Sequence, residues 1–262
     1  MVDSLRPKGG LNEVRAIYFD LDDTLCGYWD ASKEGLRKAF EQHGPEGHAI
    51  PDLIMHWAAA FRGFAPHIKK TTWYEGYLKN AEPSRTEQMR LTLERLGISD
   101  PDHASKLSHA YMTERDRALK LFPDALHVLG LLKDRYPLGL ITNGPADVQR
   151  QEIETLQVES YFNNIYIEGE MGEGKPLLSV FNRAAAAVEC QPHEVLMVGN
   201  SYGHDIKGAL EAGWHAIWIR RDSDVPPSAD GKDSKPESKP EGAPEPDATI
   251  ETLSQLLPLL GL

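Results

Sequence analysis

The chain has 262 residues, of which 40% are hydrophobic and 26% are charged, so it can bury a sizeable core as one large domain or two small ones. Its formal net charge of −12 argues against nucleic acid and anionic membranes as partners, because both are polyanionic surfaces. No apolar run reaches the roughly 18 residues of a membrane span, and the N-terminal MVDSLRPKGGLNEV lacks the apolar stretch of a secretory signal. We therefore expect a soluble, cytoplasmic protein.

The cysteine content indicates neither a zinc site nor a disulfide framework. Cys26 and Cys190 lie far apart in the sequence, and neither belongs to a CxxC or Cys/His pattern. We expect both to be reduced thiols.

The predicted elements begin with a buried strand. The run from Val14 to Phe19 is rich in β-branched and aromatic residues and is bounded by polar ones. From Ala31 to Arg117 only helical periodicity appears, and the helix predicted over SRTEQMRLTLERLG ends at Gly97, a typical C-cap residue. The sequence therefore predicts an all-helical insert directly after the first strand.

Beyond Arg117 the pattern changes to strands that alternate with helices. Such alternation predicts an α/β fold with a parallel sheet that is covered by helices on both faces. The closing stretch ATIETLSQLLPLL has the pattern of a short strand or turn followed by an amphipathic helix. The strands expected before it lie in YPLGLITNG, NIYIEG, EVLMVGNS and HAIWIRR.

One segment has the composition of a loop. Residues 222–247 are rich in Pro, Ser, Lys, Asp and Glu, so they cannot bury enough apolar surface to order themselves, and we expect a flexible surface loop. The predicted organisation is an α/β core at 1–27 and 118–262, which contains this loop, and a helical domain at 28–117.

Polar side chains gather where the predicted strands end, and open parallel sheets place their sites at that edge. Any one acidic pair could be a turn former or a helix cap. Four clusters in order on successive strands instead predict one shared site. Its candidate residues are Asp20 and Asp22, Thr142 and Asn143, Lys175, and Asn200 and Asp205.

These clusters resemble, in order, the four motifs of the haloacid dehalogenase superfamily. The first is Asp20, Asp22 and Thr24 in a DxDxT pattern, the second Thr142 in ITNG, the third Lys175 in GKP and the fourth VGNSYGHDIKGA. The resemblance covers roughly residues 12–27 and 119–222. It implies a Rossmann-like core with a C1-type helical cap inserted after the first strand. The chain is also similar to the branch of phosphatases that includes N-acylneuraminate phosphatase and nucleotidase-like members.

The resemblance implies a Mg²⁺-dependent phosphatase that acts on small phosphorylated metabolites such as nucleotides or sugar phosphates. Asp20 would be the nucleophile that forms an aspartyl-phosphate, and Asp22 would act as general acid and base. Thr142, the Asn143 backbone amide and Lys175 would bind the phosphoryl group, with Lys175 also paired to Asp20. The metal ligands implied are Asp20, Asp22 through its backbone carbonyl, Asp205 and Asn200.

Elementary electrostatics supports a metal at such a site. A phosphate monoester is a dianion that carboxylates alone would repel, and Mg²⁺ with its preference for oxygen ligands resolves the conflict. Asn200 departs from the family pattern, which usually has an acidic residue after VG. Its amide oxygen can still hold a metal-bound water, so we expect weaker Mg²⁺ binding rather than an inactive site.

Other functions stay open at this point. A phosphomutase would share all four motifs and would differ only in the cap, and a non-catalytic protein could keep the fold to bind a partner. Dehalogenases of the superfamily are disfavoured, because they do not protonate an alcohol and differ at the position of Asp22. A monomer and a homodimer are both compatible with the sequence.

Substrate choice is expected to come from the cap. Tyr28 and Trp29 follow the first motif, where the family has a mobile flap, and are the preferred candidates for contact with substrate. Helix packing or a solvated surface is the expected role of the other aromatic and basic candidates. These are Trp57, Arg62, Lys69, Lys70, Trp73 and Tyr74.

Overall fold

The computed structural model describes residues 10–230 and 235–262. The first nine residues, which belong to the stretch judged to lack a secretory signal, lie outside the described residues. Residues 231–234 of the low-complexity segment do so as well. Among the described residues no helix is both long and apolar enough to cross a bilayer.

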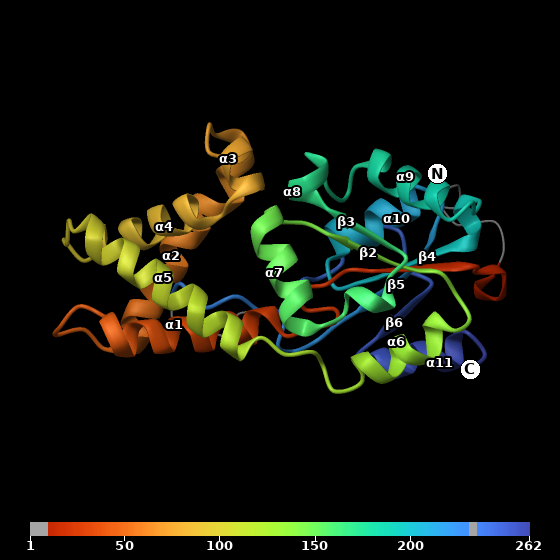
Figure 1. Ribbon diagram of the computed structural model, residues 1–262, viewed down its shortest axis with the longest axis horizontal. Helices are drawn as coiled ribbons and strands as arrows, with labels where there is room; N and C mark the ends of the chain where they lie inside the picture. Colours follow the sequence, from red (N-terminus) through yellow and green to blue (C-terminus); the bar gives the residue numbers. More distant parts are fainter. Residues whose placement is uncertain (1–9, 231–234) are drawn as a thin grey trace.

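The centre of the fold is a parallel sheet (Figure 1). Its six strands, counted over the described residues, have the order β3-β2-β1-β4-β5-β6, and every neighbouring pair is parallel. The predicted α/β class is therefore confirmed, and the closing ATI segment proves to be a strand rather than a turn. The strands are β1 Ala16–Phe19, β2 Leu138–Thr142, β3 Asn164–Ile167, β4 Val195–Gly199, β5 His215–Ile219 and β6 Ala248–Ile250.

Helices cover both faces of this sheet. Successive side chains of a strand point to opposite faces, so in β1 Ile17 and Phe19 pack into one apolar cluster and Ala16 and Tyr18 into another. The first cluster also contains side chains of α6, α7 and α11, and the second contains side chains of α9 and α10. The core helices are α6 Ala125–Lys133, α7 Ala146–Leu156, α8 Glu168–Met171, α9 Leu178–Ala187, α10 Lys207–Glu211 and α11 Leu256–Leu259.

A second group of helices, inserted between β1 and α6, forms a cap beside the sheet (Figure 1). It has an apolar cluster of its own, built around Leu36, Trp57 and Leu107. The predicted helix end at Gly97 is confirmed, because Gly97 follows α4 with a φ of +76°. At Gly35 a side chain would lie 2.8 Å from the Arg115 backbone nitrogen, so glycine allows α1 and α5 to pack closely. The cap helices are α1 Tyr28–His43, α2 Ile50–Phe64, α3 Tyr74–Lys79, α4 Glu82–Glu94 and α5 Pro101–Ala118.

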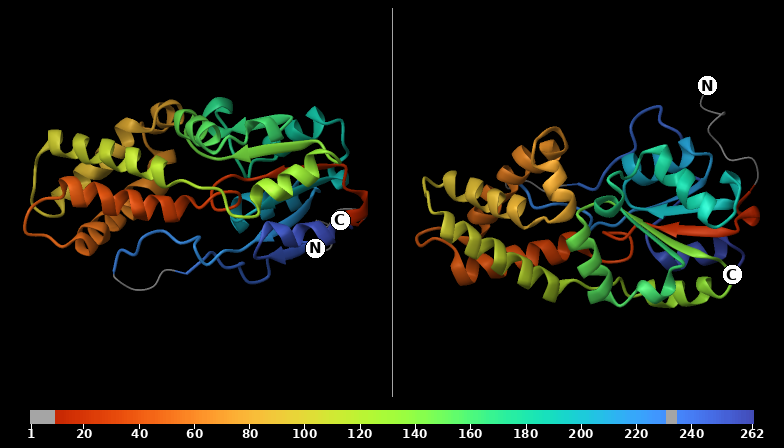
Figure 2. Two further views of the ribbon diagram at one scale, coloured as in Figure 1. Left: turned by 60° about the horizontal axis from the view of Figure 1, so that its bottom comes forward. Right: turned by 45° about the horizontal axis from the view of Figure 1, so that its top comes forward.

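The described residues of the low-complexity segment, 222–230 and 235–247, form no helix or strand. They nevertheless make specific contacts, and the segment runs from the core along the cap (Figure 2). The Pro227 carbonyl accepts a hydrogen bond from Arg62 of the cap at 2.8 Å, and Pro227 is buried. Glu237 accepts hydrogen bonds from the backbone amides of Tyr202 and Gly203 in the core, at 2.8 and 3.1 Å. The flexibility of this segment stays a prediction.

Candidate active site

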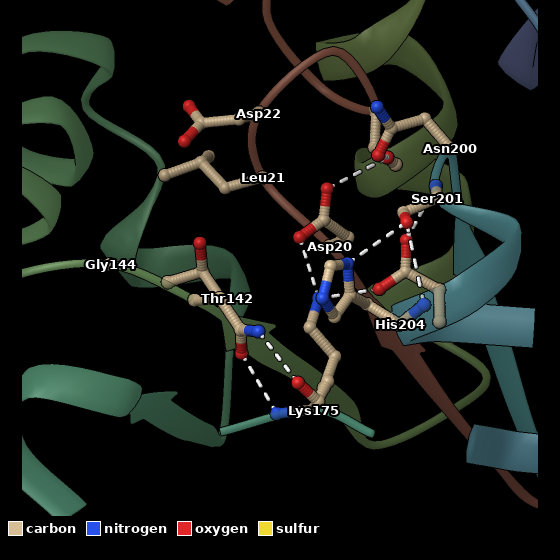
Figure 3. Close-up of polar contacts among 12 residues, drawn as sticks. Asp20, Leu21, Asp22, Thr142, Gly144, Lys175, Asn200, Ser201 and His204 are labelled. Atoms are coloured by element: carbon tan, nitrogen blue, oxygen red, sulfur yellow. Dashed lines mark hydrogen bonds and ion pairs between the residues drawn. The ribbon is translucent and has the colours of Figure 1, made fainter. Parts of the chain in front are cut away.

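The predicted site residues meet at the carboxyl edge of the sheet (Figure 3). Asp20 follows β1, Thr142 ends β2 and Asn200 follows β4, as parallel strands require. Asp205 lies in the short π-helical turn η6, Tyr202–Ile206, after β4. Gly199 makes this arrangement possible, because a Cβ at that position would collide with the Asp205 carboxylate.

Lys175 joins two of the carboxylates. Its ammonium nitrogen lies 2.6 Å from Asp20 Oδ1 and 2.6 Å from Asp205 Oδ1, and the lysine is 2% exposed. Burial alone would lower the pKa of Lys175, but the charges of Asp20 and Asp205 outweigh it and raise the pKa above its usual value. The lysine is therefore a fixed cation between two acids that lie 185 residues apart in the sequence.

The acids still outnumber the positive charge. Burial raises the pKa of Asp20 to about 6, with Lys175 opposing the shift and Asp205 adding to it. Burial likewise raises the pKa of Asp205, although Lys175 lies against it. A small hard cation would relieve this excess of negative charge.

Asn200 is held in a defined orientation beside Asp20. Its side-chain nitrogen donates to Asp224 Oδ2 at 2.9 Å, and its Oδ1 accepts from the Thr24 hydroxyl at 3.3 Å. The same hydroxyl lies 3.0 Å from Asp20 Oδ2. Because only the NH₂ group can donate to Asp224, the carbonyl oxygen of Asn200 faces the acidic cluster.

Asp22 points away from Asp20 (Figure 3). Its Oδ2 accepts a hydrogen bond from Gln149 Nε2 at 3.0 Å, and Gln149 Oε1 accepts one from the Thr142 hydroxyl. Burial, followed by repulsion from Asp20, raises the pKa of Asp22 to about 6. Gln149 thus connects an acid with a shifted pKa to the polar end of β2.

A buried ion pair between the cap and α7 lies near Asp22. Arg115 of α5 lies 3.0 Å from Glu152 Oε1, and both side chains are almost completely buried. Glu152 also accepts from Gln149 at 2.9 Å. Burial and then the Asp22 charge raise the pKa of Glu152 well above its usual value. The cap therefore reaches the acid–base end of the site through Arg115.

A cavity of about 500 Å³ extends from this cluster into the cap. At one end it is lined by Asp20, Asp22, Thr142 and Lys175. At the other end it is lined by aromatic and polar residues of the helical insert. These include Tyr28, Trp29, Trp57, Phe61, Tyr77, Tyr111, Arg85 and Gln88.

The Haloacid dehalogenase-like hydrolase family matches residues 17–219 of this chain. The chain belongs to this family. It is 29% identical to N-acylneuraminate-9-phosphatase of Rattus norvegicus over 224 residues, covering 83% of this chain and 87% of the relative. It is 31% identical to phosphoserine phosphatase of Thermus thermophilus, covering 79% of this chain and 89% of the relative.

A solved structure shows the same fold over nearly the whole length. The hydrolase YfnB of Bacillus subtilis, described as bound to magnesium, matches with a TM-score of 0.70 and 20% identity, covering 95% of this chain and 99% of its own. Hydrolases of this family are typically Mg²⁺-dependent. The predicted family, fold class and helical cap are thus confirmed, and the chain is a hydrolase homologous to curated phosphatases.

The donor set fits the metal that is usual in this family. The carboxylates of Asp20 and Asp205 contact one ammonium nitrogen, so their oxygen atoms lie within reach of one small cation. Within 10–230 and 235–262 no three His, Cys, Asp or Glu side chains form a metal-ready group. The Asp22 carboxylate faces Gln149, which leaves its backbone carbonyl as the group expected to take part. The ligand assignment stays a prediction.

Of the cap candidates, Tyr28, Trp29 and Trp57 line the cavity, whereas Lys69 and Tyr74 do not. These two instead reach across to the core and contact Glu168 Oε1, at 2.6 and 2.8 Å. Glu168 is buried and also accepts from the Gly144 backbone amide at 3.0 Å. It therefore links the cap to the turn that follows Thr142.

Sequence reasoning missed several of these partners. Gln149 and Glu152 occupy one face of the helix after the second motif at a spacing of three residues, and this is a signal that could have singled them out. Asp224 gave no signal, because it lies in a segment whose composition predicts a solvated loop. Both cysteines are free, as expected, and both are buried.

Proposed function

We propose that the protein is a Mg²⁺-dependent phosphatase that hydrolyses small phosphomonoesters through an aspartyl-phosphate on Asp20. The observation that carries the proposal is the Lys175 ammonium clamped between Asp20 and Asp205 at the floor of a cavity large enough for a metabolite. This arrangement places a nucleophile, a fixed positive charge and an oxygen-rich cation site around one position.

In the first step a carboxylate oxygen of Asp20 attacks the phosphorus atom, and the bond from phosphorus to the alcohol oxygen breaks. Asp22 gives its proton to that oxygen, and a pKa of about 6 allows it to be protonated in part of the molecules near neutral pH. In the second step water attacks the phosphorus, Asp22 takes a proton from it, and Asp20 is released with inorganic phosphate. Gln149 orients Asp22 in both steps.

The phosphoryl oxygens meet fixed donors. Lys175 offsets their negative charge, and the Asn143 backbone amide donates a hydrogen bond to them. The Thr142 hydroxyl, which donates to Gln149 Oε1 in this structure, turns to the phosphoryl group when substrate binds. Asn143 also holds Lys175 in place. Its side-chain nitrogen donates to the Lys175 carbonyl, and its side-chain oxygen accepts from the Lys175 backbone amide, both at 2.8 Å. The Lys175 ammonium and the Asn143 amide are in place before substrate arrives, so only the Thr142 hydroxyl has to reorient.

Mg²⁺ would be held by Asp20, Asp205, the Asp22 carbonyl and, directly or through water, Asn200. When bound it neutralises charge on the phosphoryl group and on the surrounding carboxylates. Asp224 supports this assignment, because it fixes Asn200 with its oxygen toward the site. An amide held in this way can replace the acidic residue usual at this position.

The names of the relatives support the substrate class. N-acylneuraminate-9-phosphatase, phosphoserine phosphatase and glyceraldehyde 3-phosphate phosphatase are each named for a small phosphorylated metabolite. We place the substrate of this chain in the same broad class, with nucleotides and sugar phosphates included.

The test is hydrolysis of phenyl phosphate by purified protein with Mg²⁺. Wild type should release inorganic phosphate, and chelation by EDTA should stop the release until Mg²⁺ is restored. Asp20→Asn should lose turnover by at least about 10³-fold, because an amide does not attack phosphorus. The matched control is Asp134→Asn, an exposed residue at the end of α6, which should behave as wild type. Equal rates for wild type and Asp20→Asn would overturn the proposal.

A further inference from the structure

The cap end of the cavity contains two polar side chains that lack partners. Gln88 of α4 is 8% exposed, and its Nε2 is buried without a hydrogen-bond acceptor. Arg85, one turn earlier, has a buried Nε that also lacks an acceptor. Both residues line the cavity that holds Asp20 and Lys175.

Such groups are costly to leave unsatisfied. A buried donor without an acceptor loses its hydration and gains nothing in return. Several other arginines of the cap have acidic partners: Arg115 pairs with Glu152 and Asp116, and Arg90 pairs with Glu87 and Glu94. Arg85 forms no ion pair with any residue in the described part of the chain.

The geometry favours a single ligand group for both donors. Arg85 and Gln88 are three residues apart on one helix, so their side chains lie on the same face. A guanidinium presents parallel N–H donors that match the two oxygens of a carboxylate, and an amide NH₂ can donate to the same group. The single positive charge of Arg85 matches the single negative charge of a carboxylate.

Aromatic rings line the cap part of the same cavity. Trp57 and Phe61 stack with their ring centroids 5.3 Å apart, and Trp57 also lies against Tyr111. These rings can cover the body of a ligand, while polar groups are found at both of its ends.

We propose that Arg85 and Gln88 form a carboxylate-binding subsite, so the preferred substrate is a phosphomonoester whose alcohol portion carries a carboxylate. The inference rests on the proposed function and narrows its substrate class. The phosphate occupies the core end of the cavity, and the carboxylate reaches α4. Specificity against uncharged alcohols follows, because they leave the Arg85 and Gln88 donors unpaired.

Two matched pairs of substrates test the subsite. The pairs differ in the distance between the phosphate and the carboxylate. Phosphoserine is compared with phosphoethanolamine, which lacks only the carboxylate, and 4-carboxyphenyl phosphate with phenyl phosphate. Wild type should show a higher kcat/KM for the carboxylated member of at least one pair. Arg85→Gln should reduce that preference by about 10- to 100-fold, the usual effect of losing a buried hydrogen bond to a charged group.

Two further variants separate the subsite from the fold. Arg90→Gln makes the same change on the same helix at an arginine whose acidic partners lie on α4 itself, and it should keep the wild-type preference. Arg85→Lys keeps the charge without the planar fork, so its preference should lie between wild type and Arg85→Gln. Two results would overturn the subsite and leave the proposed phosphatase activity intact. One is a wild-type enzyme with equal kcat/KM for both members of each pair, and the other is an Arg85→Gln variant whose kcat/KM falls equally for both members.

Binding without turnover distinguishes the two proposals. In an Asp20→Asn background, quenching of tryptophan fluorescence measures the affinity for 4-carboxyphenyl phosphate, because Trp29 and Trp57 line the cavity. Binding that weakens about 10-fold or more on adding Arg85→Gln supports the subsite even if wild type has no phosphatase activity. Affinity that does not depend on Arg85 counts against the subsite whatever the outcome of the activity assay.

Discussion

The two ends of the cavity differ in how their polar groups are satisfied. At the core end Lys175, Thr142 and Asn200 each have partners within the protein. At the cap end, which aromatic rings also line, one side-chain donor of Arg85 and one of Gln88 have none. The difference indicates that the reaction end is organised in advance, as electrostatic catalysis requires, whereas the cap end is completed by its ligand.

The largest effect is expected from Lys175→Met. This change removes the cation between Asp20 and Asp205, so turnover should fall by at least about 10³-fold. The metal-free protein should lose about 3–5 kcal/mol of unfolding free energy, since one partner of a buried ion pair is missing. Mg²⁺ should restore part of that loss, which urea denaturation with and without the ion would measure. Lys207→Met, at an exposed residue of α10, is the control, and an equal loss there would contradict the argument.

Asp23 is an acid at the core end whose charged form is disfavoured by its surroundings. Its carboxylate is buried and accepts from the Trp29 amide at 3.2 Å, so it caps α1 and does not face solvent. Burial, followed by repulsion from Asp224 and Asp22, raises the pKa of Asp23 to about 9. The folded state therefore keeps a proton that the unfolded state releases above about pH 4, and this group lowers stability as pH rises from about 4 to 9.

Asp23→Asn should remove that dependence of stability on pH and keep the hydrogen bond from the Trp29 amide. The stability of the variant relative to wild type should grow with pH, with a slope approaching about 1.4 kcal/mol per pH unit. Denaturation in EDTA from pH 5 to pH 8 measures the slope. A constant difference over that range would show that Asp23 does not titrate in this way.

A smaller effect is expected from Gln149→Leu. The leucine cannot donate to Asp22 or accept from Thr142, so kcat should fall about 10- to 100-fold with little change in KM. The acidic limb of the pH–rate profile should also move, because Asp22 loses its hydrogen-bond donor. Gln151→Leu, two residues away and exposed, should leave both quantities unchanged. A Gln149→Leu variant with wild-type kcat would remove this residue from the organised end.

The smallest effect concerns Asp224. With Asp224→Ala the Asn200 amide loses its acceptor and is free to rotate, and we expect Mg²⁺ affinity to fall about tenfold, a typical effect of losing a residue that orients a metal ligand. Isothermal titration with Mg²⁺ measures the affinity independently of turnover. Asp222→Ala, at an exposed acid two residues away, is the matched control. Equal affinities in both variants would mean that Asp224 does not orient Asn200.

The sequence predicted the parts that depend on local pattern. Apolar runs followed by Asp20, Thr142 and Asn200 identified the strands and the edge where they end, because parallel strands align those ends. The helical insert followed from its periodicity. The partners of the site could not be predicted in this way, since the contact between Arg115 and Glu152 depends on how the cap docks, and α4 reads in sequence as an ordinary surface helix.

The Pro227 carbonyl that receives Arg62 has a consequence for substrate entry. This hydrogen bond makes the low-complexity segment a third connection of the chain between cap and core. The other two are the backbone segments before α1 and after α5. The same segment contains Asp224, which accepts a hydrogen bond from the Asn200 side chain. An outward rotation of the cap must either break the hydrogen bond from Arg62 or displace the residues that orient the Asn200 amide. Opening of the cavity to a ligand is therefore coupled to the affinity for the cation.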